Sequence, residues 1–186
     1  MSEHQGWVDW DAVAGDGISF AYIKATEGGD YVDRWFTRNW STAAGAGLTR
    51  GAYHFFTLCT GGKRQAQNFV RALPRDPAAL PPAVDLELAG NCRARPARAV
   101  VDRELRAFLF LVETTTGRRV VLYVANDFEE RYGVRASFDR PSWDRRFLLR
   151  PEGDDWVVWQ VGGFAHVNGV RGPVDLDVFR RTVWAG

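Results

Sequence analysis

Short apolar segments alternate with longer amphipathic segments along residues 19–132, and this alternation limits the possible folds more than any other feature. The apolar segments have the length of strands, and the amphipathic ones repeat with a helical period between glycine or proline residues. The expected strands are 19–24, 51–56, 83–88 and 120–124, and the expected helices are 33–46, 63–73, 97–116 and 126–132. Strands joined by helices favour a parallel sheet with right-handed crossovers, in the α/β class.

The pattern changes after residue 133. Three further strand-like segments, 142–144, 156–160 and 174–179, follow without helices between them. Strand–helix units followed by bare strands predict an irregular (β/α)-type barrel of about eight strands and five helices, with its chemistry at the C-terminal ends of the strands. The 186 residues fit one domain with a sizeable core, and no linker or repeat divides them, so we expect a single domain over 1–186.

The charge balance argues against two classes of partner. The formal net charge is +1, so a nucleic acid or an anionic membrane surface gains no electrostatic attraction to the chain. No run of about 18 apolar residues is present, and residues 1–5 lack the basic-then-apolar layout of a signal peptide. We expect a monomer that binds neither nucleic acid nor membrane. The compartment stays open between a cytoplasmic protein, a mature form without its signal and a protein exported by another route.

Two carboxylates stand two residues apart at the end of the expected strand 83–88, at Asp85 and Glu87. Alternate residues of a strand share a face, so both acids point the same way. Two like charges held together and partly buried raise at least one pKa, and such pairs divide the roles of acid and charge stabiliser in glycosidases. The alternative is an edge strand with two solvated acids. The 25 aromatic Phe, Tyr and Trp side chains (13%) suit a groove that stacks on sugar rings.

The two cysteines, Cys59 and Cys92, lack the spacing of a zinc site and form either one disulfide or two free thiols. They follow neighbouring expected strands, so a bridge above the barrel mouth fits the topology and an extracytoplasmic site of action. His54 has no partner at a ligand spacing, and we expect a structural histidine. No phosphate cradle, metal-ligand cluster or Ser-His-Asp motif is visible, so we expect no metal and no cofactor.

Seven segments together resemble one known family. They are 5–10, 20–28, 47–55, 65–69, 82–87, 159–160 and 172–177. Each is a weak signal alone, but their order and spacing resemble the muramidases of glycoside hydrolase family 25, the lysozymes that cut bacterial peptidoglycan. The resemblance implies an irregular eight-stranded barrel forming one catalytic glycosidase domain. It also implies hydrolysis of the β-1,4 bond between N-acetylmuramic acid and N-acetylglucosamine, with the peptidoglycan glycan strand as partner, in the cell wall or as a phage lysin.

The resemblance also implies roles for three acids. Glu87 matches the general acid that protonates the leaving oxygen. Asp85 matches its neighbour, which either stabilises the developing positive charge or orients the substrate's acetamido group as an internal nucleophile. Asp175 matches an acid on the last strand that shapes the electrostatics of the cleft. At the position of Asp177 the family usually has Asn. Asp177 shares a face of the strand with Asp175, so either of the two acids could fill the role that the family gives to one.

One departure from the family concerns its first strand. The family carries an Asp two residues before the position of Ser2, whereas this chain starts at Met1. We therefore expect a truncated first strand, which leaves unpaired edges on two neighbouring strands. The alternative function that follows is a non-catalytic peptidoglycan-binding homologue weakened by loss of this Asp.

Five further residues are candidates for binding substrate. Tyr53 and Tyr123 lie near strand ends, where their hydroxyls bond either the substrate or a catalytic carboxylate, or else are satisfied within the core. Trp143 and Trp159 either line the groove or pack in the core. Lys24 ends a strand and pairs either with an acid of the cleft or in a plain structural ion pair.

Overall fold

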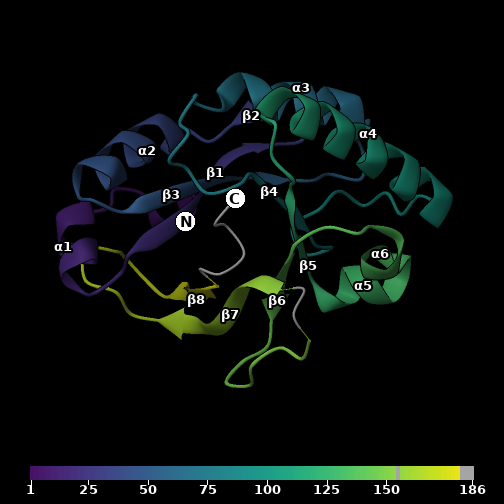
Figure 1. Ribbon diagram of the computed structural model, residues 1–186. Coiled ribbons are helices and arrows are strands. Elements are labelled where there is room, and N and C mark those ends of the chain that lie inside the picture. The colour runs from purple at the N-terminus through teal and green to yellow at the C-terminus, as the bar shows by residue number, and fades with distance from the viewer. Residues whose placement is uncertain (154–155, 181–186) are drawn as a thin grey trace.

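The computed structural model describes residues 1–153 and 156–180 and contains one curled sheet of eight strands (Figure 1). The strands are β1 (Phe20–Glu27), β2 (Tyr31–Val32), β3 (Thr49–Phe55), β4 (Ala83–Leu86), β5 (Val121–Val124), β6 (Ser142–Arg145), β7 (Trp156–Ala165) and β8 (Val174–Phe179). The helices of this part of the chain are the 3-10 helix η1 (Glu3–Gln5) and α1 (Trp10–Gly15), α2 (Phe36–Gly45), α3 (Gly62–Ala72), α4 (Arg98–Thr116), α5 (Asn126–Tyr132) and α6 (Val134–Ser137). The expected α/β class with bare final strands is confirmed.

The strand order is β2-β1-β3-β4-β5-β6-β7-β8. The ladders from β1 to β7 through β3, β4, β5 and β6 are all parallel, whereas β2 pairs with β1 and β8 pairs with β7 in the antiparallel sense. No helix lies between β1 and β2 or between β7 and β8. Antiparallel neighbours can be joined by such short connections, whereas parallel neighbours need a longer crossover. In Figure 1, helices α2, α3 and α4 cover the outside of the β1–β3–β4 half, and α5 and α6 lie beside β5.

The shortest elements were not predictable from periodicity. Helix α1 begins after Asp9, whose carboxylate accepts the backbone N–H of Ala12. Six residues are too few for an apolar repeat to stand out. Helix α2 begins at Phe36, three residues later than expected. Asp33 lies in the turn before the helix, where its carboxylate accepts the backbone N–H groups of Glu3 and Trp35.

Over residues 1–153 and 156–180, the sheet is open between β8 and the N-terminal part of β1. Met1 lies on the free edge of β1: its ammonium donates to the Tyr22 carbonyl at 2.9 Å, and the Lys24 amide donates to the Met1 carbonyl at 2.8 Å. The rings of Phe20 and Phe179 face each other across the opening, 5.7 Å apart between centroids. No ladder joins β8 to β1 within residues 1–153 and 156–180, so this part of the chain forms a curled half-barrel.

Helices α3 and α4 lie on one side of this sheet and pack closely against each other. A Cβ at Gly62 would lie 1.7 Å from the carbonyl oxygen of Glu104, so the two backbones touch where only glycine fits. Helix α4 ends at Gly117, which adopts the left-handed conformation common at helix ends. No helix of the described part of the chain is both long and apolar enough to cross a bilayer.

His54 lies in the core between β3 and α3. Its Nδ1 is 2.7 Å from the Thr26 hydroxyl, its Nε2 is 3.1 Å from the Gln65 side-chain oxygen, and its ring stacks on Phe108 at 5.0 Å. Burial lowers the pKa of His54 from 6.5 to about 3, because the charged ring would lose its hydration. The position agrees with the structural role expected from the sequence.

The buried imidazole leads to a prediction about pH. Between pH 6.5 and about 3 the unfolded chain binds a proton at His54 that the folded protein does not, so unfolding becomes easier as the pH falls. This contribution to the free energy of unfolding is expected to drop by about 2 to 3 kcal/mol between pH 6.5 and 4.5. Nuclear magnetic resonance should show a neutral His54 ring down to below pH 4, and titration near pH 6.5 in the folded protein would contradict the assignment.

Cys59 and Cys92 form a disulfide, with their Cα atoms 6.2 Å apart. They join the loop after β3 to the loop after β4. Asn91, beside Cys92, strengthens the same junction, because its side chain accepts the Leu58 amide and donates to the carbonyls of Phe56 and Glu87. The bridge and the amide network together fix the loop that follows the acid pair.

Removing this bridge is expected to destabilise the protein. The Cys59→Ser/Cys92→Ser double variant should lose about 3 kcal/mol of unfolding free energy, because a cross-link between distant residues restricts the unfolded chain. Urea unfolding at pH 7 measures the loss, and the reduced wild-type protein should match the double variant. A loss below about 1 kcal/mol would show that the native contacts hold these loops without the bridge.

Candidate active site

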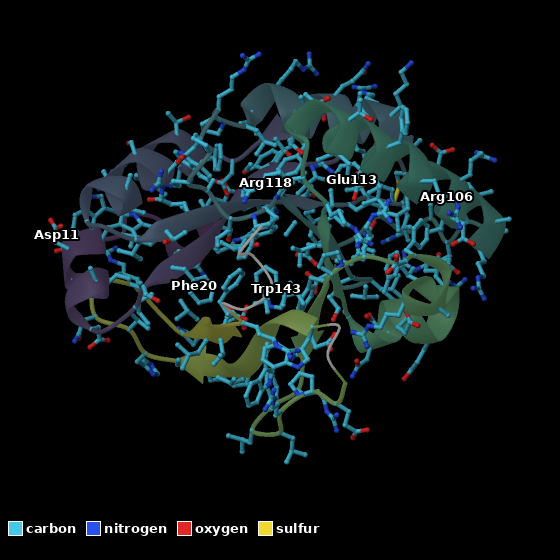
Figure 2. All side chains as sticks on the ribbon, viewed as in Figure 1. Asp11, Phe20, Arg106, Glu113, Arg118 and Trp143 are labelled. Atoms are coloured by element: carbon cyan, nitrogen blue, oxygen red, sulfur yellow. A yellow bond between two sulfur atoms is a disulfide. The ribbon has the colours of Figure 1, made fainter. Side chains whose placement is uncertain are left out.

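Side chains from seven strands line one cavity of about 480 Å³, and the acid pair stands in it at the C-terminal end of β4. This is where chemistry occurs in barrels of parallel strands. The polar and aromatic lining from β3 to β8 comprises Tyr53, Asp85, Glu87, Tyr123, Trp143, Gln160, Asp175 and Asp177. The cavity also reaches Phe20 and Tyr22 of β1; Figure 2 shows Phe20 and Trp143 on the inner side of the curled sheet.

The acid pair lies where strand alternation placed it. Asp85 is on β4, in register with Phe55 of β3 and Tyr123 of β5, and Glu87 directly follows the end of β4. Both acids line the cavity. Within the described residues, Asp85 Oδ1 is a buried acceptor without a hydrogen-bond donor, which is costly unless a ligand supplies one.

The surroundings raise the pKa of both acids. The pKa of Asp85 is raised well above its usual range, first by burial and then by the charge of Glu87, while Lys24 lowers it. Burial also raises the pKa of Glu87, the carboxylate of Asp127 adds to the rise, and Arg145 opposes it. The surroundings therefore favour the protonated form of each acid more than water would.

Lys24 is held at the edge of this site rather than inside it. Its ammonium lies 2.7 Å from a Glu27 oxygen and 5.0 Å from the centre of the Phe55 ring. It is not part of the cavity lining, yet it is close enough to lower the pKa of both Asp85 and Glu87. Its ion-pair partner comes from its own strand, three residues further along.

The two acids of β8 have different partners. Asp175 accepts a 2.6 Å hydrogen bond from the Gln160 amide of β7. Asp177 accepts the indole N–H of Trp143 at 2.9 Å, and burial raises the pKa of Asp177 to about 7. Asp175 is exposed, whereas Asp177 is partly buried and holds an aromatic wall of the cavity.

Three of the predicted aromatic residues form that wall around the acid pair. Trp143 packs against the rings of Tyr22 and Tyr123, at centroid distances of 4.8 and 5.6 Å. Burial and then the charge of Asp85 raise the pKa values of Tyr53 and Tyr123, so both hydroxyls stay protonated near neutral pH and can donate hydrogen bonds.

Trp159 is not brought into the cavity. Neighbouring residues of a strand face opposite sides, and on β7 it is Gln160 that lines the cavity. The indole of Trp159 instead packs edge-on to Trp156 and donates to the Arg146 carbonyl at 2.7 Å. It therefore supports the segment that follows β6.

Sequence reasoning missed three residues that act on this site: Gln160, Asp127 and Arg145. Asp127 stands in the first turn of α5, directly beyond the end of β5, and Arg145 is the last residue of β6. The rule that parallel strands carry chemistry at their C-terminal ends was a usable signal for both. No group of His, Cys, Asp and Glu suited to a metal ion occurs in the residues that the structure describes.

Comparisons with known proteins identify the family. The model of glycosyl hydrolases family 25 matches residues 1–170. The uncharacterized protein YegX of Escherichia coli K12 is 34% identical over 98% of this chain and 69% of its own, and lysozyme M1 of Streptomyces globisporus is 31% identical over 96% and 66%. The structure of a family 25 glycosyl hydrolase from Bacillus anthracis matches with a TM-score of 0.86 and 32% identity, over 96% of this chain and 86% of that one. The chain therefore belongs to the glycosyl hydrolases of family 25.

Proposed function

We propose that this chain is a muramidase that hydrolyses the β-1,4 bond between N-acetylmuramic acid and N-acetylglucosamine in peptidoglycan. The observation that carries the proposal is the Asp85–Glu87 pair in a cavity walled by aromatic side chains. Family membership and the similarity to lysozyme M1 support the same reaction. Flat aromatic walls beside hydrogen-bonding groups are the surface that a sugar chain requires.

The family motif gives the two acids different roles. Burial raises the pKa of both carboxyls, the charge of Glu87 adds to the rise at Asp85, and the charge of Asp127 adds to the rise at Glu87, so the pair can hold a proton for transfer. We assign this proton to Glu87, which lies just past the end of β4 and matches the general acid of the family, and the negative charge to Asp85. Glu87 is then the general acid, as the family motif implies.

In the first step Glu87 gives its proton to the glycosidic oxygen, and the bond from that oxygen to C1 breaks. The acetamido oxygen of the same sugar attacks C1 and quenches the positive charge. Asp85 accepts the acetamido N–H through Oδ1, the buried acceptor that has no donor within the described residues, and stabilises the charge on the cyclic intermediate. In the second step the Glu87 carboxylate takes a proton from water as that water attacks C1, and the acetamido group re-forms.

Other lining residues bind and orient the sugars. Tyr53 and Tyr123 keep protonated hydroxyls near the acid pair, and Trp143 offers a ring face fixed by Asp177. Asp175 adds a carboxylate to the cavity lining, and its negative charge favours a positively charged transition state. Lys24 acts from outside the cavity on the charges of both catalytic acids.

The proposed site of action is the bacterial cell wall, outside the cytoplasm or during phage lysis. The disulfide between Cys59 and Cys92 supports an oxidising compartment, because cytosolic thiols are kept reduced. The CTP1L endolysin, at 22% identity, shares the fold.

The test is the identity of the sugar ends released from purified peptidoglycan. Borohydride reduction followed by mass spectrometry should find new reducing ends on muramic acid. New ends on N-acetylglucosamine would mean cleavage of the other glycosidic bond and would overturn the proposal. Sedimentation of the folded protein with peptidoglycan, without any release, would instead establish a non-catalytic binding homologue.

A further inference from the structure

One segment beside the proposed active site has features that the reaction itself does not use. Residues 145–149 leave the end of β6 and run along β7, and Figure 1 shows this connection extending away from the sheet. Three hydrogen bonds hold it there: the amides of Arg146 and Leu148 donate to the carbonyls of Gln160 and Val161, and the Trp159 indole donates to the Arg146 carbonyl. The segment therefore has a defined position relative to the cavity.

Arg145 opens this segment at the rim of the cavity. It is in register with Gln160, whose amide holds Asp175, and it is close enough to lower the pKa values of both Glu87 and Tyr123. Its guanidinium lies over the Phe147 ring, 4.9 Å from the ring centre. A cation on an aromatic face is held in place while its donors stay available.

Phe147 marks the same rim from its other side. A Cβ added at Gly163 would lie 3.2 Å from the Phe147 ring and 3.4 Å from a carboxylate oxygen of Asp175. The Phe147 ring and the Asp175 carboxylate therefore both lie beside Gly163 of β7. The Arg145–Phe147 stack thus borders the mouth of the site.

The three arginines of this connection are not equivalent. Arg146 pairs with Glu152 at 3.3 Å, and Arg150 lies over the Trp156 ring at 5.5 Å. Arg145 alone of the three acts on the pKa of Glu87, and no carboxylate of the described residues forms an ion pair with it. Lys24, the other side-chain cation acting on Glu87, is already neutralised by Glu27. Among the described residues, the Arg145 side chain therefore keeps donors available for a ligand.

The proposed substrate needs such a cation. N-acetylmuramic acid differs from N-acetylglucosamine by a lactyl group whose carboxyl is either free or linked to a peptide that bears carboxylates of its own. Five acids lie in or beside the cavity: Asp85, Glu87, Asp127, Asp175 and Asp177. The negative charge on those of them that are ionised repels an anionic chain unless a positive group offsets it at the point of entry.

We propose that Arg145, held by Phe147, forms a subsite for a carboxylate carried on the muramic acid substituent of the glycan. The fork of the guanidinium matches a carboxylate, and the stacked ring keeps it at the mouth of the cavity. The inference rests on the proposed function and adds to it a basis for choosing muramic acid over N-acetylglucosamine.

Binding measurements in a Glu87→Gln background test this subsite without turnover. The probes are three tetrasaccharides: alternating muramyl glycan with free lactyl carboxyls, the same glycan with stem peptides attached, and chitotetraose, which carries no carboxylate. Isothermal titration calorimetry gives the affinity of each for the parent, for Arg145→Gln and for Arg145→Lys. Arg146→Gln removes the same charge from the same segment and serves as the matched control.

Arg145→Gln should weaken binding of a carboxylate-bearing glycan about fivefold, as expected for an exposed ion pair, and leave chitotetraose unchanged. Arg145→Lys should recover part of the affinity, and Arg146→Gln should match the parent. A loss confined to the free lactyl glycan identifies the lactyl carboxylate as the ligand, and a loss confined to the peptide-bearing glycan identifies a peptide carboxylate.

Equal losses on all three probes, or none on any, would overturn the subsite while leaving the muramidase proposal intact. Failure of the parent to bind either muramyl glycan would count against both the subsite and the proposed function.

Discussion

Replacing Glu87 with Gln is expected to lower kcat/KM on peptidoglycan by about 10³-fold, because the leaving oxygen then departs without a proton donor. The fold should persist, since Gln has the same shape and burial already raises the pKa of Glu87 against ionisation. Release of reducing ends measures the loss, and thermal unfolding checks the fold. Glu130→Gln, the same change at an exposed position on α5, is the control and should retain full activity.

Two further results decide how the loss at Glu87 is understood. The Glu87→Gln variant should still sediment with peptidoglycan, because the aromatic walls and the remaining acids are unchanged. Activity within about tenfold of the wild type would remove Glu87 from the role of general acid, since a lost acid costs more than that.

Replacing Asp85 with Asn is expected to reduce kcat by about 10²-fold with little change in KM. The negative charge of Asp85 acts on the positive charge that develops in the transition state, so its loss weakens that state more than the bound substrate. Asp11→Asn makes the same change on the exposed face of α1 and should leave kcat unchanged.

The same Asp85 variant should shift the pH dependence. The two acids interact, so removing the Asp85 charge makes ionisation of Glu87 easier and lowers the pKa of Glu87. The general acid must be protonated, so the basic limb of the kcat/KM profile should move to lower pH in Asp85→Asn. A basic limb that stays in place or moves to higher pH would show that the two carboxyls are not coupled in the way the site requires.

The acid pair was predictable because it depends on local rules. Strand periodicity put Asp85 and Glu87 on one face, and strand–helix alternation put that face at the C-terminal end of a parallel sheet. The class of the fold followed from the same alternation. The family motifs added the chemistry, which periodicity alone does not contain.

The partners across the site depended on register, which the sequence pattern did not contain. Trp159 and Gln160 are adjacent on β7, so only one of the two side chains faces the cavity. The register between β6 and β7 shifts near Ser142, so the alternation of residues along β7 did not predict which of the two it is. The pairing of Asp177 with Trp143 joins β8 to β6 and requires the full curl of the sheet.

Lys24 shows the same limit within one strand. Its position at the end of β1 suggested an ion pair, and the structure gives it Glu27, three residues away and across a shift in the β1–β3 register between Lys24 and Thr26. A regular strand would not bring such side chains together, because residues at odd spacing face opposite sides. Irregularities of this kind are invisible to a count of alternating residues.

In the proposed mechanism Glu87 supplies the proton while Asp85 directs the substrate's own acetamido group. The configuration of the first-formed product distinguishes this mechanism from a single displacement by water. Proton nuclear magnetic resonance during cleavage of a defined muramyl glycan should show the β-anomer appearing first, because two displacements at C1 retain configuration. The α-anomer as first product would contradict the claim, since Asp85 would then have to activate water for a single inverting displacement.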